Sequence, residues 1–275
     1  MPHLLSRRAA PPILAILGTA LLAAVAATLV ANWDARLWEG MELGKAALEN
    51  EYCEANHMAD FVRQPVNAWS NLCYFLIGLW IIGWAVQDAT AKRRANPLQR
   101  FPAMTLWVGL MQVGLCFGSF FFHASLTKTG QHWDMAFTYG LSLSLAFGAA
   151  YRLLLDLGIT ENARTKAVTL LLTIGATVVV YLIKWRLDGR IALPAMMLSG
   201  LVLVVIVYFR LRAKLNGWLL VAGIVALILS AVFRSLDLAK VGCAPMGWMQ
   251  LHACWHLCTG LAAFFFLAFL HAEKP

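Results

Sequence analysis

The feature that most constrains this chain is a succession of long apolar runs, each about as long as a membrane is thick. A helix needs about 20 mostly apolar residues to cross the hydrocarbon core of a bilayer. Eight stretches meet that requirement: 11–32, 66–87, 102–124, 132–154, 166–184, 191–209, 217–235 and 248–271. Only 13% of the residues are charged, against about a quarter in soluble domains. The sequence therefore predicts an all-α, polytopic membrane helix bundle.

The first apolar run differs from the others in its position and its flanks. It follows Arg7 and Arg8, as a signal sequence would, yet it is longer than the usual signal core of about 7–15 residues. We interpret it as an uncleaved N-terminal anchor helix, with cleavage near Ala31 or Ala35 as the alternative. A seven-helix core remains in either case. The expected domains are an anchor helix with an extracytoplasmic linker, residues 1–50, and a seven-helix domain, residues 51–275.

Basic residues in the short loops predict the orientation of the chain. Lys and Arg cluster in the segments 92–100, 164–166 and 210–214, which all lie on the side of the N-terminus if every run spans the bilayer. Because short cytoplasmic loops carry an excess of Lys and Arg, we expect both termini to be cytoplasmic. Topology thus explains the net charge of +8, which does not indicate a nucleic acid partner. The acidic segment 33–65 is then extracytoplasmic.

The cysteines allow one candidate disulfide. Four of the six cysteines lie inside apolar runs, whereas Cys53 and Cys243 fall in predicted loops. These two are therefore the one plausible pair, and an extracytoplasmic position would provide the oxidising conditions that a disulfide needs.

Ionisable groups inside the runs are few, and they are informative because such groups are costly in a bilayer and usually functional. Ser119 and His123 lie four residues apart at the end of the third run, on one helix face. His252 and His256 have the same spacing in the last run, so both imidazoles can share one cation. Asp134 opens the fourth run. Because successive spans alternate in direction, all five residues are predicted to lie at the extracytoplasmic face.

Zinc suits this set of side chains. Three neutral imidazoles and one water make a tetrahedral catalytic site, in which the metal lowers the pKa of the water to about 7. We expect Asp134 to act as general base and then as proton donor. Ser119 would donate a hydrogen bond to the oxyanion that develops on an attacked carbonyl. The implied reaction is hydrolysis of an amide or ester in a lipid. In the structural alternative, the histidines only pack or hydrogen bond between helices.

Other polar residues in the runs are expected to be structural. Arg234 and Asp237 lie three residues apart near the end of the seventh run. Side chains at this spacing are neighbours on a helix, so the sequence predicts an ion pair at a helix end.

A second candidate site precedes and enters the second run. Glu51, Glu54 and Asn56 offer oxygen ligands at close spacing, with the carbonyl of Tyr52 and the side chain of Gln64 nearby. Hard cations such as calcium bind about six to eight oxygens. From the residues alone, a solvated acidic loop is the simpler interpretation.

Taken together, these segments resemble the alkaline ceramidase family, in a superfamily of seven-helix membrane hydrolases that also includes progestin and adiponectin receptors. The motifs are ExCExN at 51–56, QPxNxWSNL at 64–72, GSxxFH at 118–123 followed by Asp134, and HxxWH at 252–256. They cover nearly the whole chain after residue 50. The resemblance implies a zinc-dependent amidase that releases a fatty acid and a sphingoid base from ceramide-like membrane lipids, with no obligatory protein partner.

The same resemblance implies roles for individual residues. The implied zinc ligands are His123, His252 and His256, with Ser119 and Asp134 beside the catalytic water. The implied calcium ligands are Glu51, Tyr52 (through its carbonyl), Glu54 and Asn56, with Gln64 at the last ligand position. That last ligand is typically acidic in the family, so Gln64 is expected to weaken calcium binding. The family also has a covalent link between the N-terminal segment and a later loop, which Cys53 and Cys243 would supply.

Two rival functions stay open from the sequence. A receptor-like relative in the same superfamily would bind lipid and signal to a partner, and turnover of an N-acyl lipid would separate it from an enzyme. A membrane haem protein would use two histidines on opposite faces of the macrocycle. His252 and His256 share one helix face and cannot both serve, and a visible absorption spectrum would separate haem from zinc.

Overall fold

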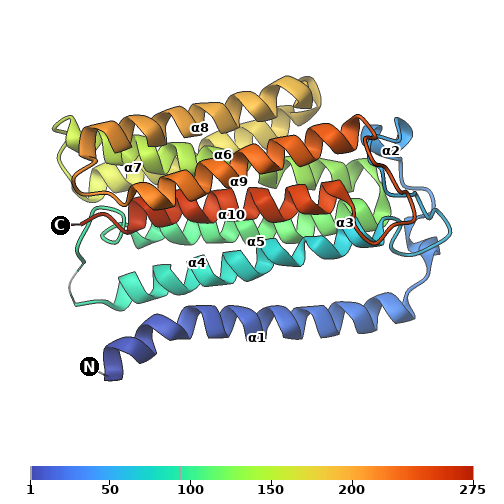
Figure 1. The fold of residues 1–275 in the computed structure, drawn as a ribbon, viewed down its shortest axis with the longest axis horizontal. Helices are drawn as coiled ribbons and strands as arrows, with labels where there is room; N and C mark the ends of the chain where they lie inside the picture. Colours follow the sequence, from blue (N-terminus) through green and yellow to red (C-terminus); the bar gives the residue numbers. More distant parts are fainter. Residues whose placement is uncertain (1, 93, 275) are drawn as a thin grey trace.

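Long helices run side by side in a bundle in the computed structural model of the chain, which describes residues 2–92 and 94–274 (Figure 1). The α-helices are α1 (Pro2–Asn32), α2 (Lys45–Leu48), α3 (Pro65–Ser70), α4 (Leu72–Thr90), α5 (Pro102–Ser125), α6 (Lys128–Asp156), α7 (Ala163–Ile183), α8 (Gly189–Leu211), α9 (Gly217–Leu238) and α10 (Leu251–His271). Two short 3-10 helices are η1 (Ala35–Trp38) and η2 (Lys184–Arg186). The all-α fold is confirmed, with a seven-helix core formed by α4 to α10 and one additional N-terminal helix, α1.

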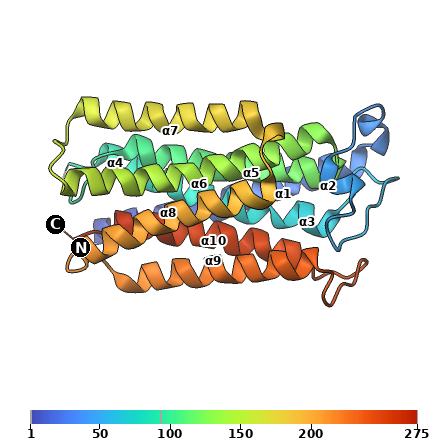
Figure 2. The ribbon, with the colours of Figure 1, turned by 90° about the horizontal axis from the view of Figure 1, so that it is seen from above.

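Seven spans among the described residues are long and apolar enough to cross a membrane, and they include α1. The remaining long helix, α6, carries more polar residues than the others and falls outside that group. It packs on α5, α7 and α8, so protein rather than lipid surrounds much of it (Figure 2). Thr138, Ser142 and Ser144 each donate a hydrogen bond to a carbonyl of the preceding turn, which satisfies their hydroxyls without water.

Local signals explain where several helices begin. Pro65 and Pro102 occupy the first positions of α3 and α5, where a missing N–H costs nothing. Asn162 caps α7 by accepting from the N–H of Thr165 at 2.9 Å. The expected spans therefore match the observed helices closely, because these start signals are encoded next to the apolar runs.

The helix α1 lies outside the seven-helix core and runs along α4 (Figure 1). Only 6% of its most apolar window is buried, so most of its surface is left to contact lipid. The buried apolar core lies instead among α4, α5, α6, α8, α9 and α10. There α4 and α5 approach closely at Gly78 and Gly109, where a Cβ on either residue would lie within 3.1 Å of the other's carbonyl oxygen.

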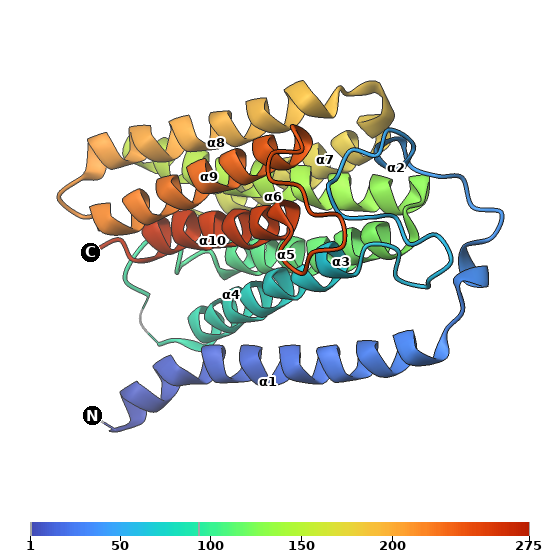
Figure 3. The same ribbon diagram turned by 45° about the vertical axis from the view of Figure 1, so that its right-hand side comes forward.

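The two ends of the bundle differ. Both chain termini lie at one end, as an even number of spans requires (Figures 1 and 3). The opposite end carries α2, α3, the turn between α7 and α8 and the loop between α9 and α10 (Figure 3). We call this opposite end the α3 end. All five residues proposed for the zinc site belong to helix turns near this end.

Candidate metal centre

Three histidines from two helices meet at the α3 end. His123 lies in the last turn of α5, and His252 and His256 lie in the first two turns of α10. Their candidate ligand atoms all lie within 4.8 Å of one another, and no more than 2% of any of the three residues is exposed. Among the described residues, these three side chains lie close enough to one another to hold a metal ion. The structure thus brings together the three predicted ligands.

A hydrogen bond to Ser70 sets the tautomer of His256. Ser70 Oγ lies 2.7 Å from His256 Nδ1 and also donates to the carbonyl oxygen of Asn67 at 2.7 Å. Because a hydroxyl has one proton, Ser70 Oγ must accept its hydrogen bond from His256 Nδ1–H. The buried Nε2 atom of His256 is then unprotonated, and it has no partner in the described part of the chain.

A hydrogen bond to Gln64 sets the tautomer of His123. Gln64 Oε1 lies 2.7 Å from His123 Nδ1, while the amide nitrogen of Gln64 donates to Asn56 Oδ1 at 2.7 Å. An amide oxygen only accepts, so His123 Nδ1 carries the proton. The Nε2 atom of His123 is buried without a partner among the described residues, and so is the Nδ1 atom of His252.

The three orphaned ring nitrogens fit a zinc ion. A buried polar atom without a hydrogen bond costs about 1–3 kcal/mol, so three such atoms in one place indicate a ligand. Neutral imidazole is a preferred zinc ligand, and three imidazoles leave one open position for water or substrate. Hydrogen bonds to the other ring nitrogen, seen here for His123 and His256, are typical of metal-ligating histidines.

A close helix contact places Asp134 beside Ser119. A Cβ on Gly118 would lie 3.0 Å from the carbonyl carbon of Trp133, so α5 and α6 touch backbone to backbone there. Ser119 and Asp134 each follow one residue later, and their side chains lie within interacting range. Ser119 Oγ nevertheless forms no well-oriented hydrogen bond within the described residues. Asp134 is buried and does not belong to the histidine group.

Two aromatic rings enclose the histidines. The ring centroid of Tyr52 lies 4.2 Å from that of His252 and 5.2 Å from that of His123. Trp255 stacks on His252 with centroids 5.1 Å apart. Burial raises the pKa of the Tyr52 hydroxyl, which therefore stays protonated. The sequence does not predict the position of the Tyr52 ring, because its contacts with α5 and α10 are distant in the chain and leave no local pattern.

An apolar cavity borders the histidines inside the bundle. Tyr74 and Trp255 line it, and their ring centroids lie 5.8 and 5.3 Å from that of His256. A largely apolar groove between α8 and α9 meets this cavity. The residues that line both are Met197, Leu201, Leu227 and Trp255. Apolar surface therefore continues from the groove between α8 and α9 into the cavity, where the rings of Tyr74 and Trp255 lie between the cavity and the histidines.

The buried three-histidine centre, the neighbouring carboxylate and the apolar cavity agree with a comparison against known families. A sequence model of the Ceramidase family matches residues 45–274. The chain belongs to the ceramidase family. No curated protein sequence matches the chain closely enough to count as a relative. The match covers the seven-helix core and leaves α1 outside it.

The residues that the ceramidase resemblance implies for calcium have protein partners in the structure. Glu54 accepts hydrogen bonds from the N–H groups of Val66 and Asn67 at 2.6 and 2.8 Å, at the start of α3. Burial raises the pKa of the Glu54 carboxyl, while these two hydrogen bonds oppose that change. Gln64 and Asn56 bond to each other, as described above. These contacts hold α3 against the preceding segment, and calcium binding stays a prediction.

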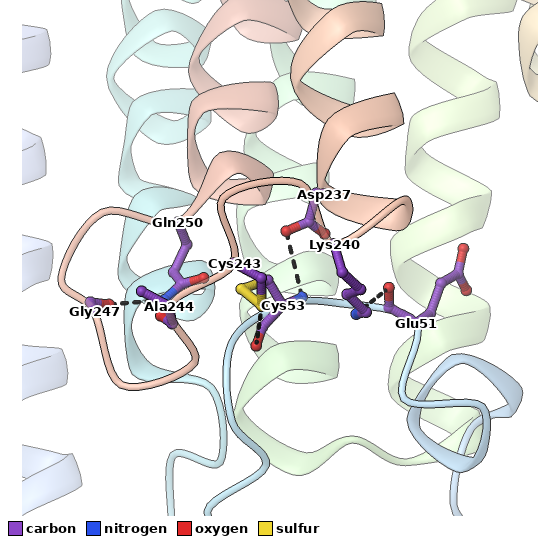
Figure 4. Close-up of a disulfide and its surroundings, with 8 residues drawn as sticks. All are labelled: Glu51, Cys53, Asp237, Lys240, Cys243, Ala244, Gly247 and Gln250. Atoms are coloured by element: carbon purple, nitrogen blue, oxygen red, sulfur yellow. Dashed lines mark hydrogen bonds between the residues drawn. A yellow bond between two sulfur atoms is a disulfide. The ribbon is translucent and has the colours of Figure 1, made fainter.

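The expected disulfide between Cys53 and Cys243 is present (Figure 4). It joins the segment before α3 to the loop before α10, across 190 positions of sequence. Lys240 supports the same junction by donating to the backbone carbonyl of Glu51 at 2.8 Å (Figure 4). The disulfide therefore holds the segment that contains Gln64 close to the helix that contains His252 and His256.

Arg234 does not pair with Asp237 as their spacing predicts. Arg234 Nη2 lies 3.3 Å from Glu51 Oε1. Asp237 Oδ1 instead accepts a hydrogen bond from the N–H of Cys53 at 3.3 Å (Figure 4). The partners lie 183 and 184 positions away along the chain, which is why local spacing predicts the wrong pair.

Proposed function

We propose that this ceramidase family protein is an integral membrane, zinc-dependent amidase that hydrolyses the N-acyl bond of ceramide-like lipids. The observation that carries the proposal is the set of three buried, unpartnered imidazole nitrogens beside an apolar cavity. The cavity accounts for a lipid substrate, and the histidines account for a hydrolytic metal. The proposal assigns anchoring to residues 1–50 and catalysis to residues 51–275.

The donor set suits zinc chemistry at neutral pH. Zinc, when held by His123, His252 and His256, supplies a Lewis acid that makes water nucleophilic near pH 7. Asp134 accepts a proton from the attacking water and later delivers it to the amide nitrogen. The water oxygen bonds to the acyl carbon and the C–N bond breaks, which releases a fatty acid and a sphingoid base. Ser119 donates a hydrogen bond to the carbonyl oxygen as negative charge develops on it.

In this proposal, the substrate enters the bundle from its lipid-facing side, between α8 and α9. The groove between α8 and α9 faces the surface of the bundle and continues into the apolar cavity. A lipid with long chains can therefore pass from the bilayer to the histidines without exposing its chains to water. The apolar walls then hold the chains while the amide lies near Trp255.

Replacing Asp134 by Asn tests the reaction directly. Asp134→Asn is expected to abolish release of fatty acid from N-acyl lipids, while zinc content by elemental analysis stays near that of the wild type. Ser119→Ala is expected to lower kcat by roughly 10²–10³ with zinc retained. Full activity in Asp134→Asn would remove this residue from the mechanism.

Measurements of metal content, visible absorption and turnover on the same purified protein distinguish the rival functions. We expect stoichiometric zinc and no Soret band in the visible absorption spectrum. A Soret band without zinc would show a haem protein instead. Zinc without turnover of any N-acyl lipid would favour the receptor-like function.

We also propose calcium as a second, weakly bound ion at Glu51, the Tyr52 carbonyl, Glu54, Asn56 and Gln64. Gln64→Glu keeps an oxygen facing His123 and adds a negative charge, so it is expected to tighten calcium binding several-fold. Isothermal titration with calcium, on zinc-loaded wild type and variant, measures the change. Absence of binding to both proteins would eliminate calcium.

The proposed orientation places both termini in the cytoplasm and the metal centre towards the extracytoplasmic face. It rests on the loop charges and on the common end at which the termini lie. A fluorescent protein fused to the C-terminus is expected to fold and fluoresce in the cytoplasm. A periplasmic reporter phosphatase that is active at the same fusion point would reverse the orientation.

A further inference from the structure

A polar cavity of about 310 Å³ opens at the α3 end, next to the metal centre. We call it the vestibule; its walls come from α2, the start of α6, the turn between α7 and α8, and Arg234 of α9. Tyr52 forms the wall between the vestibule and the histidines, since it lines the cavity and its ring contacts His252. Arg234 and Arg190 line both the vestibule and the lateral groove. A lipid in the groove therefore has its polar end at the vestibule.

The vestibule carries more positive than negative charge. Five basic and three acidic side chains line it. The three carboxylates already have partners there: Glu49 pairs with Arg190 at 3.3 Å, and Glu51 pairs with Arg234 at 3.3 Å. Asp188 accepts the backbone N–H of Arg190 at 2.9 Å as the cap of α8. The excess of cations is therefore not neutralised by the walls themselves.

Among the described residues, Lys184 is the buried cation of the vestibule that lacks a direct ion pair. Only 8% of this residue is exposed, and it lines the vestibule. Its Nζ atom lies 3.6 Å from the centroid of the Trp185 ring. The carboxylates of Asp134 and Glu51 attract it from a distance, but Lys184 forms no direct hydrogen bond or ion pair within the described residues. Removing an ammonium from water is costly unless an anion compensates, and an aromatic face compensates only in part. The missing partner is therefore an anion that enters the vestibule.

We propose that the vestibule binds an oxyanion on the head group of the lipid, so that the preferred substrates are N-acyl lipids with a phosphate-type group on the sphingoid base. This inference rests on the proposed amidase function. Lys184 provides the charge for the oxyanion, the lateral groove holds the chains, and the amide lies between them at the histidines. A neutral ceramide leaves Lys184 without its counter-ion and is the poorer substrate.

Hydrolysis of a matched pair of lipids tests the preference. The zinc-loaded protein in detergent micelles is given a ceramide and the same ceramide as a phosphate monoester. We expect kcat/KM to be roughly tenfold higher for the phosphorylated lipid, and Lys184→Gln to remove that ratio. Lys184→Arg keeps the charge and is expected to retain most of it. Arg36→Gln, which removes an exposed charge outside the vestibule, is the matched control and is expected to leave the ratio unchanged.

A binding measurement separates failure of this inference from failure of the amidase proposal. Affinities for both lipids and for inorganic phosphate are measured on zinc-loaded Asp134→Asn, with and without Lys184→Gln. Tighter binding of the phosphorylated lipid that depends on Lys184 supports the vestibule assignment, even where neither lipid is hydrolysed and the amidase proposal fails. Equal affinities for both lipids overturn the assignment, whatever the turnover. Equally tight binding of inorganic phosphate without the lipid also overturns it, because the vestibule is then a site for free anions.

Discussion

The chemistry of single residues at this centre depends on which ring nitrogen carries a proton. His123 and His256 each use Nδ1–H in a hydrogen bond and leave Nε2 without a partner. The acceptors, Gln64 and Ser70, come from the end of the segment before α3 and from α3 itself. The segment that ends in this short helix therefore orients the rings of two candidate ligands from outside the histidine group.

Loss of the Ser70 hydroxyl is expected to weaken zinc binding roughly 10–100-fold, because His256 then loses the acceptor that fixes its tautomer. Competition between Ser70→Ala and a chromophoric chelator measures the change. Ser199→Ala is the matched control, since Ser199 also donates to a carbonyl three residues earlier but lies exposed on α8. Equal zinc affinity in Ser70→Ala and wild type would show that the hydrogen bond does not orient the ring.

At the scale of elements, the site depends on how closely α5 approaches α6 and on how α3 is attached to α10. Gly118 allows the backbone of α5 to touch that of α6 at Trp133, which brings Ser119 to Asp134. The disulfide between Cys53 and Cys243 attaches the α3 segment to the loop before α10. The first contact brings together two proposed catalytic residues. The second holds the segment that supports the candidate ligands close to α10.

Gly118→Ala is expected to separate α5 from α6 by a few tenths of an ångström, because the added Cβ meets backbone atoms that cannot rotate away. We expect a loss of about 1–3 kcal/mol in stability and a fall in kcat, with zinc content retained. Thermal unfolding in detergent and initial rates measure both. Gly175→Ala on α7 is the control, since its Cβ meets no atom within 4 Å. A Gly118→Ala protein with unchanged kcat would separate the helix contact from catalysis.

At the scale of the whole molecule, the two ends of the bundle carry different features. The α3 end holds the metal centre and the vestibule, while the other end is closed by ion pairs between loops and helix ends. Arg100 bonds to Glu161 at 2.6 Å, and Lys166 approaches the same carboxylate to 2.8 Å. Arg152 pairs with Glu273 at 2.6 Å in a largely buried position. The pairs of Glu161 join the loop between α4 and α5 to the loop between α6 and α7, and the pair of Arg152 joins α6 to the segment after α10.

The ion pairs of Glu161 make the stability of the protein depend on pH at the end of the bundle that carries the termini. The hydrogen bond from Arg100 lowers the pKa of the Glu161 carboxyl below its ordinary value of 4.5. A lowered folded-state pKa contributes stability that is present above about pH 4.5 and is lost as pH falls through the folded value. Glu161→Gln is therefore expected to destabilise the protein by about 1 kcal/mol or less at pH 7, since solvent partly screens the pair.

The difference in stability between wild type and Glu161→Gln is expected to shrink as the pH falls below 4.5 and through the lowered pKa of the folded state. Thermal unfolding in detergent at several pH values measures it, with Glu39→Gln at an exposed carboxyl as the control. A difference that grows as the pH falls would contradict the assigned direction of the pKa shift.

The sequence by itself determined the helices, the common end of the candidate ligands and the disulfide pair. Apolar runs set the spans because lipid cannot satisfy a backbone that is not helical. Alternating span direction then placed the histidines at one end, and the position of Cys53 and Cys243 outside the runs left one pairing. Each of these follows from local composition and from connectivity, which a sequence states directly.

Only the tertiary structure decided which groups contact one another. It placed the Tyr52 ring on His252, paired Arg234 with Glu51 rather than Asp237, and left Lys184 at a cavity without a direct ion pair among the described residues. The physical reason is the same in each case. Side-chain contacts across helices depend on rotation and depth of packing, to which residues far apart in the chain contribute together. A repeating local pattern reports which face of a helix is buried, but not which partner lies against it.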